Sequence, residues 1–199
     1  MKRGHVLAPG LMLALGLMLA LGGCGQSATR YGTVQRTPSP VTALRGGPPT
    51  HIAVIVMENE EYRDIIGSRQ TPFINALARR SALAGSMHAI THPSLPNYLA
   101  LTGGSTFQIT SDCTDCAVPS AASLADQLTG AHLSWKAYLE DLPHPCYGGA
   151  GAGAYAKKHD PFMYYGRVAQ DPAQCTHVVG LTELSHDEQA HAVPRFAWI

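Results

Sequence analysis

The sequence predicts an α/β fold with a mostly parallel sheet flanked by helices. Strand-like and helix-like segments alternate after residue 50, which is the order that builds parallel sheets. The first such segment, residues 51–57, is a nearly unbroken run of apolar, largely β-branched residues. A run of this kind is typical of a parallel strand that is covered on both faces. We therefore expect residues 51–57 to form a central strand that opens the domain.

The later elements follow from the spacing of apolar residues. Pro72 opens a helical stretch in which Phe73, Ile74 and Leu77 share one side. Apolar and polar residues alternate at 133–139, as in a strand. Further strands are expected at 84–90, 178–181 and 196–199, helices at 73–83, 96–101, 120–128 and 186–191, and a Gly- and Pro-rich surface loop at 142–158.

The N-terminal segment has the pattern of an export signal. Lys2 and Arg3 precede an apolar stretch at 7–21, which is too short for a comfortable membrane span. The stretch ends in Leu-Gly-Gly-Cys at Cys24, which resembles the lipobox of bacterial lipoproteins. The alternative is an ordinary signal peptide with an incidental cysteine. We expect an exported protein that is held at the cell membrane or envelope by a lipid on Cys24.

Composition divides the chain into three segments. Residues 1–23 are expected to be the signal peptide, and residues 24–50, rich in Ser, Thr, Gly and Pro, a flexible tether. Residues 51–199 are long enough for one domain with a core. Charged residues make up only 14% of the chain and the formal net charge is zero, so no nucleic-acid partner is expected.

Four cysteines remain after the expected cleavage: Cys113, Cys116, Cys146 and Cys175. An even number in an exported chain favours structural disulfides, and all three pairings remain open. The spacing of Cys113 and Cys116 also allows a zinc or redox site. A structural zinc site would need a second close pair, which the sequence does not contain.

Polar residues directly after the first strand are candidate metal ligands. Ligands bind at the carboxyl ends of parallel strands, and the first strand delivers Glu58 and Asn59 to that edge. A carboxylate and an amide offer the oxygen atoms that hard divalent cations prefer. The alternative is a solvated turn, because Glu60 and Glu61 beside them are equally polar.

Residues 91–104, THPSLPNYLALTGG, contain the second candidate group. Ser94 comes just before a predicted helix, where free backbone N–H groups and the helix dipole favour a phosphate and help a hydroxyl to lose its proton. His92 and Asn97 could hold phosphate oxygens. The alternative is that Ser94 only caps the helix.

Four motifs follow one another along the chain: Glu58-Asn59 after an apolar strand, THPSLPNYLALTGG, SWKAY at 134–138 and KHDPF at 158–162. In this order they resemble the bacterial and fungal phosphoesterase family, which includes acid phosphatases and phospholipase C-type enzymes of the alkaline-phosphatase-like superfamily. The resemblance covers residues 51–199 and implies the N-terminal part of an alkaline-phosphatase-like fold. Family members continue into strands that supply more metal ligands, so the chain is expected to be incomplete at its C-terminus.

The resemblance also implies a role for each matching residue. Ser94 would be the nucleophile, with Thr91 as an alternative, and His159 would lie near the leaving group. Glu58 and Asn59 would bind a divalent metal ion, whose identity stays open. His92 and Asn97 would bind the phosphate of the substrate.

The sequence therefore predicts an exported, metal-dependent hydrolase of phosphate esters that acts on a small phosphate ester or a phospholipid. A catalytically inactive lipoprotein of the same fold, with a binding role or none, is the alternative. A serine esterase would need a G-x-S-x-G motif, which is absent; Gly104-Ser105 comes closest.

Overall fold

The computed structural model describes residues 49–199. The predicted signal peptide, nearly all of the tether and the lipidation site Cys24 lie outside these residues. No helix within the described part is long and apolar enough to cross a membrane.

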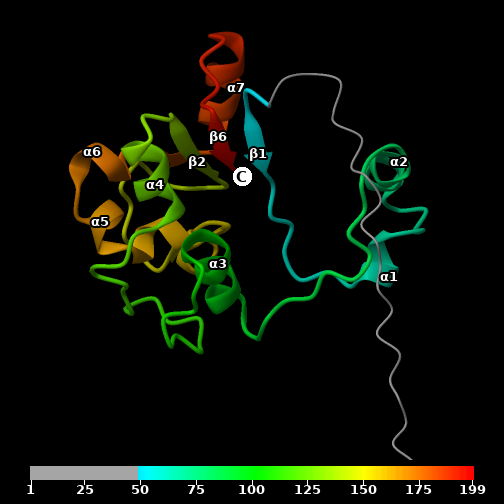
Figure 1. Ribbon diagram of the computed structural model, residues 1–199, viewed down its shortest axis with the longest axis horizontal. Coiled ribbons are helices and arrows are strands. Elements are labelled where there is room, and N and C mark those ends of the chain that lie inside the picture. Colours follow the sequence, from blue (N-terminus) through cyan, green and yellow to red (C-terminus); the bar gives the residue numbers. More distant parts are fainter. Residues whose placement is uncertain (1–48) are drawn as a thin grey trace, which may run out of the picture. The chain divides into compact units, whose positions relative to one another are not determined.

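A four-stranded parallel sheet forms the centre of the fold (Figure 1). Its strands are β1 (Ile52–Val54), β2 (Trp135–Leu139), β5 (Val178–Gly180) and β6 (Phe196–Trp198), in the order β1-β6-β2-β5. All neighbouring pairs are parallel. The predicted fold class is confirmed.

The first strand differs from the prediction. Within residues 49–199, β1 lies at the edge of the sheet, and its Ile52 is half exposed. It is also shorter than expected, although Val56 continues the contact by donating its backbone N–H to the carbonyl of Ile199 at 2.9 Å. The apolar run predicted a strand correctly, but the expected central position is wrong. The interior positions belong to β6 and β2, and all three residues of β6 are buried between β1 and β2.

Helices and short elements connect the strands. The α-helices are α1 (Tyr62–Ile65), α2 (Pro72–Arg80), α3 (Ser94–Gly103), α4 (Leu124–Gly130), α5 (Gly166–Ala169), α6 (Pro172–Cys175) and α7 (Thr182–Gln189). Two 3₁₀ turns, η1 (Lys157–His159) and η2 (Pro161–Tyr164), follow the small hairpin of β3 (Gly151–Ala152) and β4 (Tyr155–Ala156).

Two further predictions need correction. Residues 84–90 form turns and bends instead of a strand, and Met87 and Ile90 are largely exposed. A turn forms at Gly85 and Ser86, so this stretch contributes no strand to the sheet. The region 142–158 is not a plain surface loop, because it contains the β3–β4 hairpin and ends in η1.

The sheet is covered on both faces. On one face, aromatic residues of the sheet and of η2 form the main core: Phe162 packs against Trp135 and Trp198, with ring centroids 5.2 and 5.7 Å apart. On the other face, Tyr138 and Val179 pack beneath α7. Burial on both faces explains why these strands are apolar over nearly their whole length.

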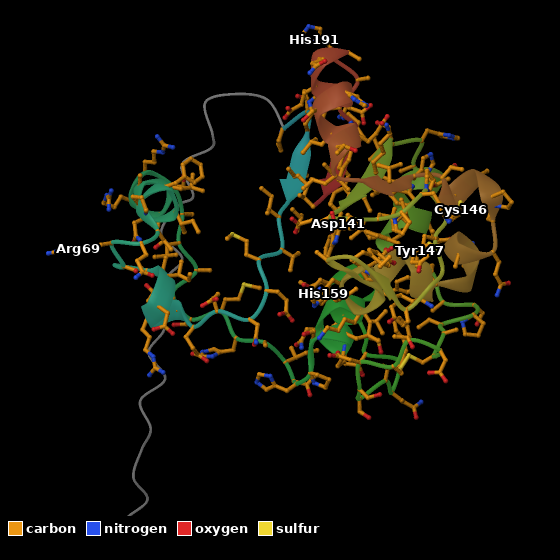
Figure 2. All side chains as sticks on the ribbon, turned by 180° about the vertical axis from the view of Figure 1, so that it is seen from behind. Arg69, Asp141, Cys146, Tyr147, His159 and His191 are labelled. Atoms are coloured by element: carbon orange, nitrogen blue, oxygen red, sulfur yellow. A yellow bond between two sulfur atoms is a disulfide. The ribbon has the colours of Figure 1, made fainter. Side chains whose placement is uncertain are left out.

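The four cysteines form two disulfides, Cys113–Cys116 and Cys146–Cys175 (Figure 2 labels Cys146). The prediction of structural disulfides is therefore confirmed, and the pairing that the sequence left open is decided. The long bridge ties the loop after β2 to the end of α6, next to the buried core.

Candidate active site

The end of β1 leads the chain to Glu58. Ile199 donates its N–H to the carbonyl of Val54 at 2.9 Å, so the backbone stays paired with β6 just before it leaves the sheet. Glu58 then lies beyond the carboxyl edge, where ligands bind in parallel sheets. Its side chain is 32% exposed, so one carboxylate group is open to solvent and to a ligand. Asn59 follows with a positive φ of 57°, a conformation that asparagine tolerates well.

Ser94 lies at the first position of α3, and its hydroxyl donates a hydrogen bond to Oε1 of Glu58. The residue in the N-cap position is Pro93, and Ser94 makes no capping hydrogen bond. The hypothesis that Ser94 only caps the helix is therefore wrong. The helix itself is fixed by Leu95 and Leu99, which are fully buried, so the Ser94 hydroxyl starts from a rigid element.

His159 completes the cluster from η1 (Figure 2). Its Nε2 atom lies 3.4 Å from Oε1 of Glu58, the same oxygen that accepts from Ser94. The imidazole ring stacks on Tyr98, one turn along α3, with ring centroids 5.5 Å apart. Three residues separated widely in sequence, Glu58, Ser94 and His159, are thus brought together around one carboxylate.

Asn97 makes contacts within its own loop. Its Oδ1 accepts from the backbone N–H groups of Ile90 and Thr91, and its Nδ2 donates to the carbonyls of Thr91 and Pro93. These bonds hold the turn that presents Ser94. A role in binding phosphate stays a prediction, and in this structure both ends of the amide are engaged with the backbone.

The remaining predicted residues lie outside the cluster. His92 is exposed next to the cis peptide bond to Pro93, and Asn59 is exposed beside Glu58. Neither side chain contributes to the Ser94–Glu58 hydrogen bond or to the contact of His159 with Glu58. Their roles stay predictions.

Tyr98 was missed by the sequence reasoning. It is 6% exposed, and burial, together with the charge of Glu58, raises its pKa to about 12. It therefore stays neutral and serves as the apolar wall behind His159. Its position four residues after Ser94, on the same side of the helix, was the available signal.

Asp112 was also missed, and Lys158 was quoted only as part of the KHDPF motif, with no role of its own. Oδ1 of Asp112 accepts the N–H of Leu95 at 3.0 Å, and its Oδ2 accepts from Nζ of Lys158 at 3.0 Å. Leu95 follows Ser94 in the chain, and Lys158 precedes His159. Asp112 therefore contacts the neighbours of two residues of the cluster. The sequence carried no signal for Asp112, because it stands in a polar loop with no periodic pattern.

The oxygen donors fit a hard divalent cation in kind. The carboxylate of Glu58 and the hydroxyl of Ser94 lie side by side, and the amide of Asn59 is adjacent in the chain. Over residues 49–199, no three or more His, Cys, Asp or Glu side chains converge as they would around a metal ion. Glu58, Asn59 and Ser94 therefore fit as some of the ligands of a divalent cation.

The site can be compared with known proteins. Residues 67–199 match the Phosphoesterase family. The chain belongs to this family. The resemblance suggested by the four sequence motifs is therefore confirmed.

Curated relatives of this phosphoesterase are phosphatases, which are phosphoric ester hydrolases. A phosphatidylinositol-3-phosphatase of Mycobacterium tuberculosis is 39% identical over 120 residues, which cover 59% of this chain and 40% of the relative. A phosphate-repressible acid phosphatase of Penicillium chrysogenum is 28% identical over 166 residues, covering 81% of this chain and 40% of the relative. An acid phosphatase of Aspergillus fumigatus is 27% identical over 168 residues, which cover 81% of this chain and 37% of the relative. The chain thus spans well under half the length of these relatives.

Proposed function

We propose that this phosphoesterase hydrolyses phosphate esters, with Ser94 as the nucleophile. The observation that carries the proposal is the shared contact of Ser94 and His159 with one oxygen of Glu58 at the start of α3. A hydroxyl, a carboxylate and an imidazole in contact supply a nucleophile, a proton acceptor and a proton donor. Family membership supports phosphate esters as the substrates.

In the first step, the Ser94 oxygen attacks phosphorus and its proton passes to the Glu58 carboxylate, which already accepts the hydroxyl hydrogen bond. The bond from phosphorus to the leaving oxygen breaks, and protonated His159 gives its proton to that oxygen. The products are an alcohol and a phosphoserine at Ser94.

In the second step, water attacks the phosphoserine and gives its proton to neutral His159. The bond between phosphorus and the Ser94 oxygen breaks, and Glu58 returns the proton to that oxygen. The enzyme is then restored, with inorganic phosphate as the product. The stack on Tyr98 keeps the imidazole in one orientation through both steps.

A divalent metal ion bound at Asn59, Ser94 and Oε2 of Glu58, the oxygen that contacts neither Ser94 nor His159, would lower the pKa of the serine hydroxyl and offset the negative charge of the transferring group. Asn59 can contribute an amide oxygen from its exposed position. His92 and Asn97 are proposed to contact the phosphate. For Asn97 this requires that one of its backbone contacts opens.

The names of the relatives favour phosphate monoesters over diesters. One relative is named a phosphatidylinositol-3-phosphatase, and a 3-phosphate on the inositol ring of a membrane lipid is a monoester. We extend this to a phospholipid or a small phosphate monoester as the substrate. A phospholipase C-like activity would instead cleave a diester.

Export to the cell envelope is part of the same proposal. Two disulfides support an oxidising compartment, because such bonds are rare where thiols are kept reduced. A lipid on Cys24 would place the enzyme beside phospholipid substrates. Membrane fractionation tests this: Cys24→Ala should release the protein from the membrane fraction, and an unchanged distribution would contradict the anchor.

Hydrolysis of chromogenic esters tests the activity. We expect p-nitrophenyl phosphate to be cleaved faster than bis-p-nitrophenyl phosphate. The activity should disappear in Ser94→Ala and after treatment with a chelator, and should persist in Ser105→Ala. A folded, metal-supplemented sample with no activity would favour the alternative, a catalytically inactive lipoprotein with a binding role.

A further inference from the structure

One carboxylate joins the two sides of the candidate site. Asp112 accepts the backbone N–H of Leu95 through Oδ1 and the ammonium of Lys158 through Oδ2, both at 3.0 Å. Leu95 follows Ser94 in α3, and Lys158 precedes His159 in η1. The nucleophile and the histidine are therefore each one residue away from a contact with Asp112.

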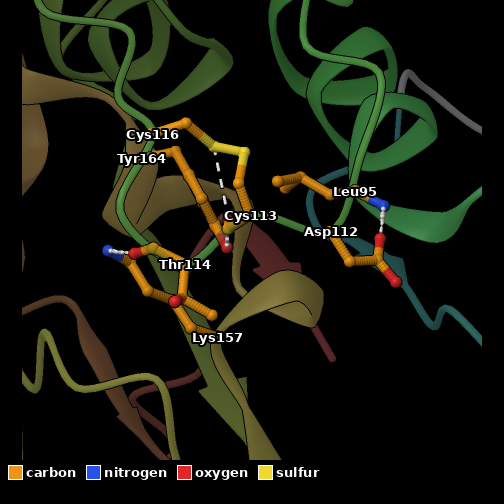
Figure 3. The surroundings of a disulfide bond; sticks show 7 residues. All are labelled: Leu95, Asp112, Cys113, Thr114, Cys116, Lys157 and Tyr164. Carbon is orange, nitrogen blue, oxygen red and sulfur yellow. Dashed lines mark hydrogen bonds between the residues drawn. A yellow bond between two sulfur atoms is a disulfide. The ribbon is translucent and has the colours of Figure 1, made fainter.

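The loop that carries Asp112 is itself held in place (Figure 3). The Cys113–Cys116 disulfide starts at the next residue. Tyr164 donates its hydroxyl hydrogen to the carbonyl of Cys113 at 2.9 Å, and Lys157 donates to the carbonyl of Thr114 at 2.9 Å. Both donors come from η2 and η1, the segment that also carries His159.

The charges support a fixed position for Asp112. Burial disfavours its ionised form, but the hydrogen bond from Leu95 and the contact with Lys158 outweigh burial and lower its pKa. The carboxylate also lies at the positive end of α3, where a negative charge is favourable. Asp112 is thus ionised, and both of its oxygens accept hydrogen bonds. This arrangement suits a structural role better than that of a proton acceptor in the reaction.

We propose that Asp112 is a positioning residue of the phosphoryl-transfer site: it fixes Ser94 relative to His159, and the Cys113–Cys116 loop holds it there. The inference rests on the proposed function and deepens it. Asp112 does not touch the Ser94 hydroxyl or the imidazole; it acts through Leu95 and Lys158. Small displacements of a nucleophile are costly, since a shift of about 1 Å can reduce a rate about 100-fold.

Steady-state kinetics of Asp112→Ala and Asp112→Asn give the first test, with p-nitrophenyl phosphate as the probe. We expect kcat to fall by about 10- to 100-fold in Asp112→Ala while KM changes little, because alignment is lost and substrate contacts remain. Asp112→Asn should lose less, since an amide oxygen can still accept from Leu95. Lys158→Met should lose part of kcat.

Asp115→Asn is the matched control. Asp115 is an exposed carboxylate between the same two cysteines, so its replacement removes a charge from the same loop. Its kcat should stay near the wild-type value. Equal losses in Asp112→Ala and Asp115→Asn, or a loss confined to KM, would overturn the positioning role.

A second readout does not depend on activity. NMR of the backbone amides and of the imidazole should show faster hydrogen exchange at Leu95 and a changed His159 ring signal in Asp112→Ala, with the remaining spectrum retained. If Leu95 and His159 are unchanged, the inference fails even if the enzyme is active. If the wild-type protein shows no Ser94-dependent hydrolysis, the proposed function fails, and the NMR comparison still decides whether Asp112 aligns the two residues.

Removal of the short disulfide tests whether the Cys113–Cys116 loop holds Asp112 in place. The double variant Cys113→Ser/Cys116→Ser should lower kcat in the same direction as Asp112→Ala. Combined with Asp112→Ala, it should add little further loss, because both changes release the same contact. Fully multiplicative losses, with near-UV circular dichroism showing a folded protein, would contradict a shared role.

Discussion

At the scale of single residues, the site depends on a stack of two rings, although Tyr98 takes no part in the proposed proton transfers. Tyr98 packs its ring on His159 with centroids 5.5 Å apart and is itself buried. Its raised pKa of about 12 keeps it neutral, so its contribution to the site is that of an apolar surface. The ring, and not the hydroxyl, should therefore matter.

Replacement of Tyr98 separates these contributions. Tyr98→Phe keeps the ring, and we expect kcat close to the wild-type value. Tyr98→Ala removes the stack and leaves a cavity, so it should lower kcat and reduce the free energy of unfolding by about 3–5 kcal/mol. Kinetics and urea unfolding of the two variants provide the measurement. A large loss of kcat in Tyr98→Phe would show that the hydroxyl takes part.

Asp160, next to His159, gives a prediction on pH. It is fully buried, and burial raises its pKa to about 7. The hydrogen bond from Tyr155 and the positive charge of Lys157 lower the pKa, but burial outweighs them. Backbone N–H groups of Phe162 and Met163 also favour its charged form. The folded protein therefore holds a proton on Asp160 at pH values where the unfolded chain has lost it.

Because the pKa is raised on folding, the contribution of Asp160 to stability falls as pH rises from about 4 to about 7. Asp160→Asn cannot ionise and should gain stability relative to the wild type over this range. Thermal unfolding of both proteins at several pH values measures the difference. A difference that does not change with pH would contradict the buried, protonated carboxyl.

At the scale of elements, the two disulfides should differ in their effect on stability. Cys146 and Cys175 are 29 residues apart, whereas Cys113 and Cys116 are three apart. By loop-closure entropy, the long bridge should contribute about 4 kcal/mol and the short one about 2 kcal/mol. Denaturant unfolding of the two double Cys→Ser variants tests the order. A larger loss for the Cys113–Cys116 pair would show that the short loop stabilises the whole fold.

Helix α7 is held to the sheet by a partly buried ion pair. Asp187 accepts hydrogen bonds from Nζ of Lys136 and from the hydroxyl of Tyr138, both at 2.6 Å. Burial opposes the ionisation of Asp187, but these two donors outweigh it and lower its pKa. The other carboxylate near Lys136, Glu183, lies 3.8 Å away and is more exposed.

Asp187→Asn should therefore cost about 2 kcal/mol, since it leaves the Lys136 ammonium without its close partner and Lys136 is a quarter exposed. Glu183→Gln is the control and should cost less than about 0.5 kcal/mol. Urea unfolding at neutral pH measures both. Equal costs would show that the pair at 2.6 Å has no special role in attaching α7.

The sequence predicted most of the strands, but it was less informative about which strands and side chains lie next to one another. Short apolar segments predicted β5 and β6, because buried parallel strands need apolar residues on both faces, and the alternation at 133–139 predicted β2. The same rule wrongly placed β1 in the centre, since an apolar run reports burial potential and not strand order. Ser94 was found by its motif, whereas Asp112 was not, because its contacts with Leu95 and Lys158 span 17 and 46 residues.

At the scale of the whole molecule, the chain belongs to the Phosphoesterase family and spans well under half the length of its curated relatives. The residues described here bring a serine hydroxyl and a histidine ring to one carboxylate, that of Glu58. Within residues 49–199, no three or more His, Cys, Asp or Glu side chains converge as they would around a metal ion. The central claim that these residues support is the transfer of a phosphoryl group to Ser94.

Direct detection of that transfer is the decisive measurement. The purified protein would be mixed with p-nitrophenyl phosphate, quenched in acid within milliseconds to seconds, and digested for mass spectrometry. We predict phosphate on Ser94 in the wild type and none in Ser94→Ala. His159→Ala should hold more of it, because p-nitrophenolate leaves without a proton and only the second step then needs His159. Phosphate on Thr91 or His159 instead, or turnover that continues in Ser94→Ala, would contradict the account.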